Sequence, residues 1–396
     1  MMTDFHRKTV AFLISQGITL FGSSLVQFAI VWYVTLNTSS GAWVSALSIC
    51  SFVPQFLISF VAGAWADRYP RKTLIILADA AIAAATLALA LLFPVLGETS
   101  ALRIALLVAS ALRSLGAGIQ TPAVNAMIPQ LVPEGSLMRF NGINAALQSA
   151  VQFAAPAAAG AILSFGSLRN TLFIDIATAL VGIGLLACIA IPKQAATEAG
   201  PPVRVQIALG MRYAARHRMI GKLLLGYGLF IFLTVPAGFL ATLFVSRTYA
   251  DSYAYMSVVE IVGFLGMAVG GLLVGTWGGF ANRARTLVIG MAAFGALAIG
   301  MGAIRSFPIY LILMSAYGIA LTAVQTATTT IIQEQTEPAM QGRVFGFLGA
   351  MYSGFLPVGM AVFGPLSDAL PMRALMILSG ILLLLLSAAI RLGRET

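Results

Sequence analysis

Long apolar stretches follow one another along almost the whole chain, and they are the feature that most constrains its fold. A membrane-spanning helix needs about 20 mainly apolar residues. Twelve segments of this kind lie at residues 9–36, 43–65, 73–93, 101–127, 139–164, 170–191, 220–247, 253–276, 286–304, 308–332, 342–367 and 371–391. Charged residues make up only 9% of the 396 residues, against about 25% in soluble domains. The chain is therefore predicted to lie in a bilayer.

The apolar pattern favours helices over a membrane β-barrel. Barrel strands alternate apolar and polar residues, whereas residues 75–92 and 377–386 are apolar at almost every position, with Asp79, Thr86 and Ser379 as the exceptions. We therefore predict an all-α membrane protein. Cys50 and Cys188 both fall within apolar spans, so the sequence indicates no disulfide framework, no metal site and no cofactor.

The distribution of basic residues predicts the orientation. With both termini in the cytoplasm, 17 of the 23 Lys and Arg residues lie in cytoplasmic segments and five on the other side, while Arg113 lies within a span. Cytoplasmic loops of membrane proteins carry such an excess of positive charge. We therefore expect a multi-pass protein of the bacterial plasma (inner) membrane with both termini inside. The net charge of +10 then reflects loops beside anionic lipid, and no nucleic-acid partner is expected.

The spans fall into two sets of six. We predict an N-terminal six-helix bundle at 1–191, a cytoplasmic linker at 192–219 and a C-terminal six-helix bundle at 220–396. Within the linker, residues 203–219 place apolar and basic side chains on different faces, which predicts a helix lying on the inner membrane surface. The two halves also share loop motifs, since Gly63 and Trp65 after the second span match Gly275 and Trp277 after the eighth. Two related halves are typical of transporters.

One loop motif carries a family resemblance. Residues 63–72 read Gly63-Ala-Trp-Ala-Asp67-Arg68-Tyr-Pro-Arg71-Lys72, which resembles the signature between the second and third spans of major facilitator superfamily transporters. Arg113 with Gly116 and Gly118 is similar to the arginine motif of that family's fourth span. Pro156 and Gly160 resemble its fifth-span antiporter motif, a helix-packing motif, with Ala155 and Ala159 where glycines are usual. The resemblance is strongest to the branch that holds the macrolide and enterobactin exporters, and it implies two pseudo-symmetric six-helix bundles and drug:proton antiport.

The residues of this loop also support a physical interpretation as a gate. Gly63 permits close approach of helix backbones, and Asp67 can pair with Arg71 to hold the cytoplasmic face shut. The basic residues Arg68, Arg71 and Lys72 could instead serve only to fix the orientation of the chain.

Charges within spans are costly and therefore indicate function. Arg113, Glu260, Asp175 and Asp79 are the candidates for proton coupling or charge compensation. Arginine does not release its proton, so Arg113 must find a carboxylate, helix carbonyls or water. We assign the proton to Glu260, with Arg113 as the central cation, and expect structural roles for Asp175 and Asp79.

Polar and aromatic side chains on single helix faces predict the wall of a substrate cavity. The candidates are Gln16, Gln27, Phe28, Gln148, Gln152, Phe232 and Gln325. Packing between helices is the alternative role for these residues.

The sequence thus predicts a secondary transporter, a proton-coupled exporter of amphipathic organic molecules that works by alternating access. No nucleotide-binding loop or hydrolase motif is present in the 396 residues, so no enzyme activity is expected. Protons, membrane lipids and a small amphipathic substrate are the expected partners of a monomer. A lysophospholipid flippase or an uptake permease of the same fold is one alternative, and a non-transporting receptor or scaffold is another.

The predicted orientation can be tested at the C-terminus. A protease-sensitive tag placed after Thr396 should resist protease added to intact cells and should be cleaved in inside-out vesicles, because the terminus is expected in the cytoplasm. Cleavage of the tag in intact cells would show that the orientation is wrong.

Overall fold

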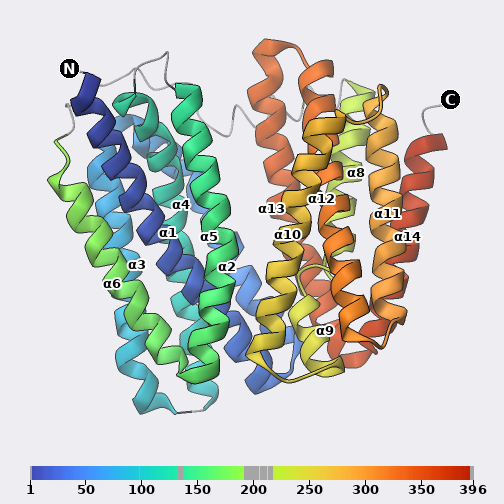
Figure 1. Cartoon of the computed structure of the whole chain (residues 1–396), viewed down its shortest axis with the longest axis horizontal. Coiled ribbons are helices and arrows are strands. Elements are labelled where there is room, and N and C mark those ends of the chain that lie inside the picture. The colour runs from blue at the N-terminus through green and yellow to red at the C-terminus, as the bar shows by residue number, and fades with distance from the viewer. Residues whose placement is uncertain are drawn as a thin grey trace. The chain divides into compact units, whose positions relative to one another are not determined.

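The computed structural model describes residues 2–97, 99–132, 137–190, 205, 212 and 217–392, and within these residues every regular element is a helix. Eleven of the described helices are long and apolar enough to cross a membrane. Figure 1 shows the helices running roughly parallel within each part of the chain. The predicted all-α membrane fold is confirmed.

The first six predicted spans each correspond to one helix. The helices are α1 (Met2–Thr38), α2 (Gly41–Arg68), α3 (Arg71–Leu96), α4 (Ser100–Leu131), α5 (Leu137–Phe165) and α6 (Leu168–Cys188). The helices after the linker are α8 (Arg218–Thr234), α9 (Ala241–Thr248), α10 (Tyr253–Trp277), α11 (Arg283–Ala303), α12 (Phe307–Gln335), α13 (Pro338–Ala369) and α14 (Met372–Leu392).

The seventh predicted span is broken in the structure. The sequence predicts a span over 220–247. Within it, α8 ends at Thr234, residues 235–240 form turns, and α9 begins at Ala241. Pro236 cannot donate a backbone hydrogen bond, which ends the helix. The Thr234 carbonyl instead accepts from the Gly238 amide at 2.8 Å and from the Tyr317 hydroxyl of α12 at 3.4 Å. The seventh predicted span is therefore an interrupted helix in the structure.

Most of the predicted linker lies outside the residues that the structure describes. Of residues 192–219, only Val205, Arg212 and 217–219 belong to the described residues. The surface helix expected at 203–219 lies outside them for the most part.

Contacts between Cα atoms divide the chain into two compact units. Unit 1 contains Met1–Val34 and Leu47–Gly200, and unit 2 contains Thr35–Ala46 and Pro201–Thr396. The end of α1 and the beginning of α2 therefore belong to unit 2, although the rest of both helices belongs to unit 1. The polypeptide passes between the units at these two points as well as through the linker.

In unit 1, α3 packs against both α4 and α6. Apolar side chains at one end of the unit form a buried cluster to which all six helices or the residues just after them contribute. Its members include Phe12, Leu13, Ala66, Ile75, Met127, Phe140 and Leu186. Because Phe12 and Phe140 are at most 1% exposed, this cluster fixes the ends of the helices that carry the gate motif.

In unit 2, glycines allow α10 and α12 to pack closely. A Cβ atom at Gly270 would lie 2.8 Å from the Cα of Ile319, and one at Gly318 would lie 2.8 Å from the amide nitrogen of Met267. Gly266 faces the backbone of Ser315 in the same way. Small residues at such spacing let helix backbones approach in a membrane, where helix association depends on close packing rather than on hydrophobic burial.

This packing predicts different effects for two glycines of the same helix. A Cβ at Gly266 would lie 2.9 Å from the Cα of Ser315, whereas a Cβ at Gly271 would meet nothing within 4 Å. Gly266→Ala should therefore destabilise the protein by about 1–3 kcal/mol through overpacking, and Gly271→Ala should not. Thermal unfolding of the purified protein in detergent measures the difference, and equal midpoints for the two variants would contradict the assigned interface.

Candidate functional site

A buried network of charged and polar groups lies inside unit 1. Arg113 of α4 forms an ion pair with Asp175 of α6, and its Nη1 atom also donates to the Oγ1 atom of Thr86 on α3. The Thr86 hydroxyl lies 2.9 Å from Oδ2 of Asp175. The second nitrogen, Nη2, donates to the Ser23 carbonyl oxygen of α1 at 3.3 Å. One guanidinium thus joins four helices.

The network is closed to solvent. Arg113 is 6% exposed, Asp175 is 1% exposed and Thr86 is fully buried. Removing two charges from water is unfavourable, and only close pairing with further hydrogen bonds offsets the loss of hydration. The arginine remains charged, and Asp175 supplies its counter-charge.

The packing of α1 against α6 places Asp175 beside α1. A Cβ at Gly22 would lie 3.1 Å from Oδ1 of Asp175 and would overlap the Thr178 hydroxyl. On the same face, a Cβ at Gly182 would lie 3.1 Å from the Ser15 carbonyl. Because both positions are glycine, α1 approaches close enough for the Ser23 hydroxyl to lie 3.5 Å from Oδ1 of Asp175.

A second polar contact lies two helical turns away. Asp79 precedes Thr86 by seven residues on α3, and Gln120 follows Arg113 by seven residues on α4. The Gln120 side-chain nitrogen donates to Oδ1 of Asp79 at 2.6 Å, whereas Oδ2 of Asp79 is buried without a hydrogen-bond partner. Between the two contacts, a Cβ at Gly116 would lie 2.5 Å from Ile82. The interface of α3 and α4 therefore has two polar layers separated by a tight apolar one.

Glu260 lies on α10 in unit 2 and is half-buried. Its carboxyl group lies close enough to the Tyr310 hydroxyl of α12 for the two groups to interact electrostatically. Tyr310 is fully buried, its hydroxyl has no hydrogen-bond partner, and its ring packs 5.5 Å from those of Phe244 and Tyr249. The carboxyl that we expected to carry the proton therefore sits beside a dense aromatic cluster.

The gate motif places its basic residues on helix ends. Arg71, the first residue of α3, donates from Nε to the Ala66 carbonyl of α2 at 3.0 Å and from Nη1 to the Ala126 carbonyl of α4 at 2.6 Å. The Lys72 ammonium donates to the carbonyls of Ala187 and Ile189 at the end of α6, at 2.7 and 2.9 Å. Cations are favourable at this end of a helix, where carbonyls lack partners.

The remaining gate residues are less informative. Arg68 ends α2 and is exposed. Gly63 lies within α2, but the surroundings of Gly63 and of the Asp67 side chain fall outside the described residues. The expected pair between Asp67 and Arg71 therefore stays a prediction.

The corresponding loop of unit 2 repeats the geometry. Arg283 begins α11 and donates from Nη1 to the Gly278 carbonyl, just after α10, at 2.6 Å. Its Nε atom lies 3.2 Å from the Glu334 carboxylate of α12. Arg71 and Arg283 thus each join the end of the preceding helix to the end of the helix after their own. The internal similarity of the sequence has a counterpart in these contacts.

The predicted cavity residues are distributed over both units. Gln27 donates to the Ser51 hydroxyl at 2.9 Å, Gln16 is buried, and Gln148 and Gln152 are exposed along α5. The ring centroids of Phe28 and Trp32 are 5.6 Å apart, and those of Phe232 and Phe363 are 5.1 Å apart. Gln325 is half-buried on α12, and Pro156 and Gly160 are both buried in α5. Their roles in substrate binding and helix packing stay predictions.

The sequence analysis missed the uncharged members of the network. Thr86, Ser23 and Gln120 were not singled out, because a hydroxyl or amide in a span usually only packs between helices. The spacing of seven residues that relates Asp79 to Thr86 and Arg113 to Gln120 was the available signal, since it places each pair on one helix face. Among the described residues, no group of three potential metal ligands comes together.

Comparisons with known proteins agree with this architecture. The sequence profile of the Major Facilitator Superfamily matches residues 12–262. The chain is 29% identical to the macrolide efflux protein A of Streptococcus pyogenes over 93% of this chain and 91% of that protein. It is 27% identical to the enterobactin exporter EntS of Shigella boydii, over 99% and 94% of the two chains.

The fold is also similar to that of a solved transporter. The crystal structure of a bacterial homologue of the iron transporter ferroportin matches with a TM-score of 0.74, covering 97% of this chain and 98% of that one at 17% identity. The resemblance seen in residues 63–72 is therefore confirmed along most of the sequence. This chain belongs to the Major Facilitator Superfamily and is a membrane transporter whose relatives include efflux pumps.

Proposed function

We propose that this protein exports amphipathic organic molecules across the bacterial plasma membrane in exchange for protons, by alternating access. The observation that carries the proposal is the buried contact between Arg113, Asp175 and Thr86. Ionisable residues inside spans are costly and rare, and they typically mark substrate or ion pathways and proton relays. The names of the relatives, which are macrolide, multidrug and enterobactin exporters, support efflux of bulky molecules.

The geometry supports Asp175 as the proton carrier in preference to Glu260. When Asp175 is ionised, it and Thr86 hold the Arg113 guanidinium between α3, α4 and α6. When Asp175 is protonated, the guanidinium loses its ionic partner and keeps only neutral acceptors such as the Ser23 carbonyl. The strength of the contacts across unit 1 then depends on the proton. This dependence is what coupling requires, because a proton shifts a conformational equilibrium only by binding the two states differently.

In this proposal, the gate loop controls the inner end of unit 1. Arg71 and Lys72 bind carbonyls at the ends of α2, α4 and α6, so movement of any of these helix ends must break charge-assisted hydrogen bonds. Each such bond contributes about 1.5–3 kcal/mol. The loop therefore favours one arrangement of the inner helix ends until other changes offset its contacts. We place both termini in the cytoplasm and expect the monomer to be the working unit.

Substitution of the two carboxylates tests the coupling. Asp175→Asn should still bind substrate but should lose substrate-driven proton movement in liposomes, because the amide cannot be ionised. Glu260→Gln should keep proton movement. Macrolides, lipophilic cationic dyes and catecholate siderophores form the substrate panel, and a pH-sensitive dye inside the liposomes reports the protons. Full coupling by Asp175→Asn together with its loss in Glu260→Gln would transfer the role to Glu260.

A second variant protects this test against misfolding. Breaking a buried pair by removing one partner costs about 3–5 kcal/mol, whereas removing both charges is far less disruptive. Arg113→Gln with Asp175→Asn should therefore fold and bind but should not couple. If the test compounds accumulate inside, the protein is an uptake permease. If only lysophospholipid moves, it is a flippase. Either result would overturn the export proposal.

The gate loop offers a matched pair of arginines. Arg71 binds two helix carbonyls, whereas Arg68 is exposed three residues earlier. Arg71→Gln should reduce the transport rate about tenfold, the effect of losing roughly 1.4 kcal/mol. Arg68→Gln removes the same charge and should leave the rate nearly unchanged. If both variants lose membrane orientation to the same degree, as measured by protease protection, the basic residues act only as topology anchors.

A further inference from the structure

The short connection between α1 and α2 is held by a carboxylate from a distant helix. Asp368, near the end of α13, accepts hydrogen bonds from the amide of Gly41 at 2.7 Å, the amide of Ala42 at 3.0 Å and the hydroxyl of Ser40 at 2.8 Å. These are the first amides of α2, which have no partner within that helix. A carboxylate at this end is also favoured by the helix dipole.

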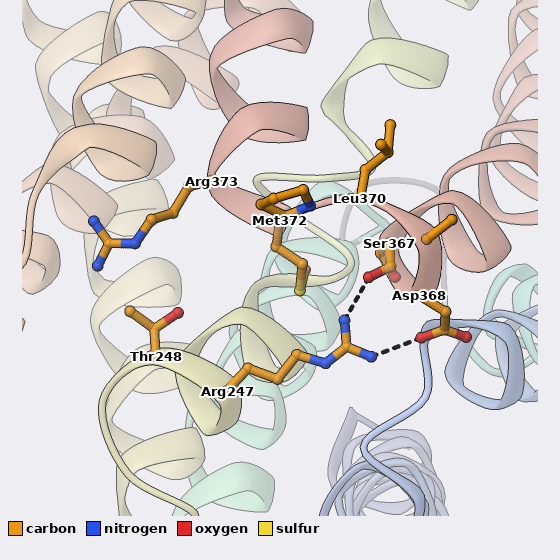
Figure 2. A pocket seen from close by; sticks show the side chains of 9 residues that line it. Arg247, Thr248, Ser367, Asp368, Leu370, Met372 and Arg373 are labelled. Atoms are coloured by element: carbon orange, nitrogen blue, oxygen red, sulfur yellow. Dashed lines mark hydrogen bonds and ion pairs between the residues drawn. The ribbon is translucent and has the colours of Figure 1, made fainter.

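Arg247 completes the same contact from α9. It donates to Oδ1 of Asp368 and to the Ser367 carbonyl, both at 2.6 Å. Figure 2 shows these two contacts, with the Arg247 side chain extended toward α13 and Arg373 directed elsewhere. The Nε atom of Arg247 also donates to the Ser39 carbonyl, just after α1, at 3.0 Å. Arg247 therefore binds the carbonyl end of α1 while Asp368 binds the amide end of α2.

The backbone between the two helices is adapted to these contacts. Ser39 has a φ of 46°, which makes it the one residue other than glycine with positive φ in the described part of the chain. This left-handed conformation is unfavourable for serine and is kept only where its surroundings enforce it. Here it directs the Ser39 carbonyl to Arg247. Release of Arg247 would remove the contact that maintains this conformation.

Small residues make the packing beneath the ion pair close. A Cβ at Gly364 of α13 would lie 2.8 Å from the Gly41 carbonyl and 2.5 Å from the Cβ of Ser45. Ser45 is 2% exposed, and its hydroxyl lies 3.8 Å from the sulfur of Met360. The first turn of α2 thus lies directly on the end of α13.

The contact is suited to opening because its charges are only partly buried. The side chains of Arg247 and Asp368 are 24% and 32% exposed, and they line a hollow of about 480 Å³. Water can therefore replace each bond as it breaks, unlike in the closed site at Arg113. Exposed ion pairs contribute little individually, so the holding force comes from several weak bonds that can be lost together.

We propose that Arg247, Asp368 and residues Ser39–Ala42 form an outer latch that holds the joint of α1 and α2 on unit 2 and must release for the outward-open state to form. Residues Thr35–Ala46 belong to unit 2, whereas α1 and α2 otherwise belong to unit 1, so the latch acts where the chain leaves one unit for the other. The orientation proposed above places it on the outer face. The latch rests on alternating access but not on the identity of the coupling ion or substrate.

The latch can be tested without any substrate. In a background of Cys50→Ser and Cys188→Ser, the variant Ser45→Cys places one thiol beneath the latch, where the parent side chain is 2% exposed. A membrane-impermeant maleimide added to intact cells then reports how often this position opens to the outside. Labelling should be slow in this reporter protein. Coupling assays are not involved, so failure of the latch and failure of the proposed proton exchange are distinguishable.

The variants should rank by the contacts that they remove. Arg247→Gln, which loses the ion pair, should accelerate labelling about threefold. Asp368→Ala also leaves the amides of α2 uncapped and should accelerate it about tenfold or more. Matched controls are Arg373→Gln, from the same hollow, and Asp251→Ala, an exposed acid between α9 and α10. Neither control should change the labelling rate, and elution as a single species in detergent shows that each variant is folded.

Exchanging the charges separates a latch from a simple ion pair. Arg247→Asp combined with Asp368→Arg restores opposite charges but presents a cation to the first amides of α2, so labelling should stay fast. Slow labelling in this exchanged variant would overturn the capping role. Unchanged slow labelling in both Arg247→Gln and Asp368→Ala would overturn the latch as a whole. Labelling only by reagent supplied from the cytoplasm would overturn its assignment to the outer face.

Discussion

The Arg113 side chain is almost completely buried, and much of the interior of unit 1 is arranged around it. An arginine retains its proton even in a span, so the surrounding helices must supply the acceptors. Asp175, Thr86 and the Ser23 carbonyl supply them. For these groups to converge, α1 must approach α6 closely, which requires glycine at positions 22 and 182. The helix packing of the unit and the ion pair of Arg113 with Asp175 are therefore linked.

Charged side chains also bind backbone groups at the helix ends, where they are less buried than Arg113. Arg71, Lys72 and Arg283 bind carbonyls at or near the carboxyl ends of helices, and Arg247 and Asp368 bind both kinds of helix end. Inside the spans, a broken contact leaves a group without a partner in a medium of low dielectric. At the helix ends, water can replace the lost hydrogen-bond partner. Contacts at helix ends are therefore less costly to break than those inside the spans.

The helical class and the positions of most spans could be predicted from the sequence, because in lipid a long apolar segment has hardly any alternative to a helix. The break at residues 235–240 could not be placed with the same certainty. Pro236 and Gly238 weaken a helix, but Pro54 and Pro156 lie within continuous ones. The difference lies in the surroundings, since the Tyr317 hydroxyl from another helix meets the Thr234 carbonyl at the break.

The partners of the charged residues could be predicted only as a class. The sequence shows that Arg113 needs an acceptor, and three span carboxylates were available to it. The choice of Asp175 depends on the packing of α3 between α4 and α6, which no local pattern reveals. The role of Asp368 was missed for a related reason. A carboxylate near the end of a span is common, and its meaning here comes from the first turn of α2, which lies more than three hundred residues earlier in the chain.

Helix interfaces packed through glycine differ from the joint at Thr35–Ala46 in how easily they can separate. The glycine faces between α10 and α12 and between α1 and α6 bring backbones so close that a shift of either helix meets steric overlap. Such interfaces favour movement of a whole unit over sliding of its helices. The joint at Thr35–Ala46 combines similar small residues with exposed, hydrated charges. The Ser23 hydroxyl of α1 contacts Asp175, and α1 continues without interruption to Thr38 beside the latch. One helix thus connects the proposed proton site to the proposed outer latch.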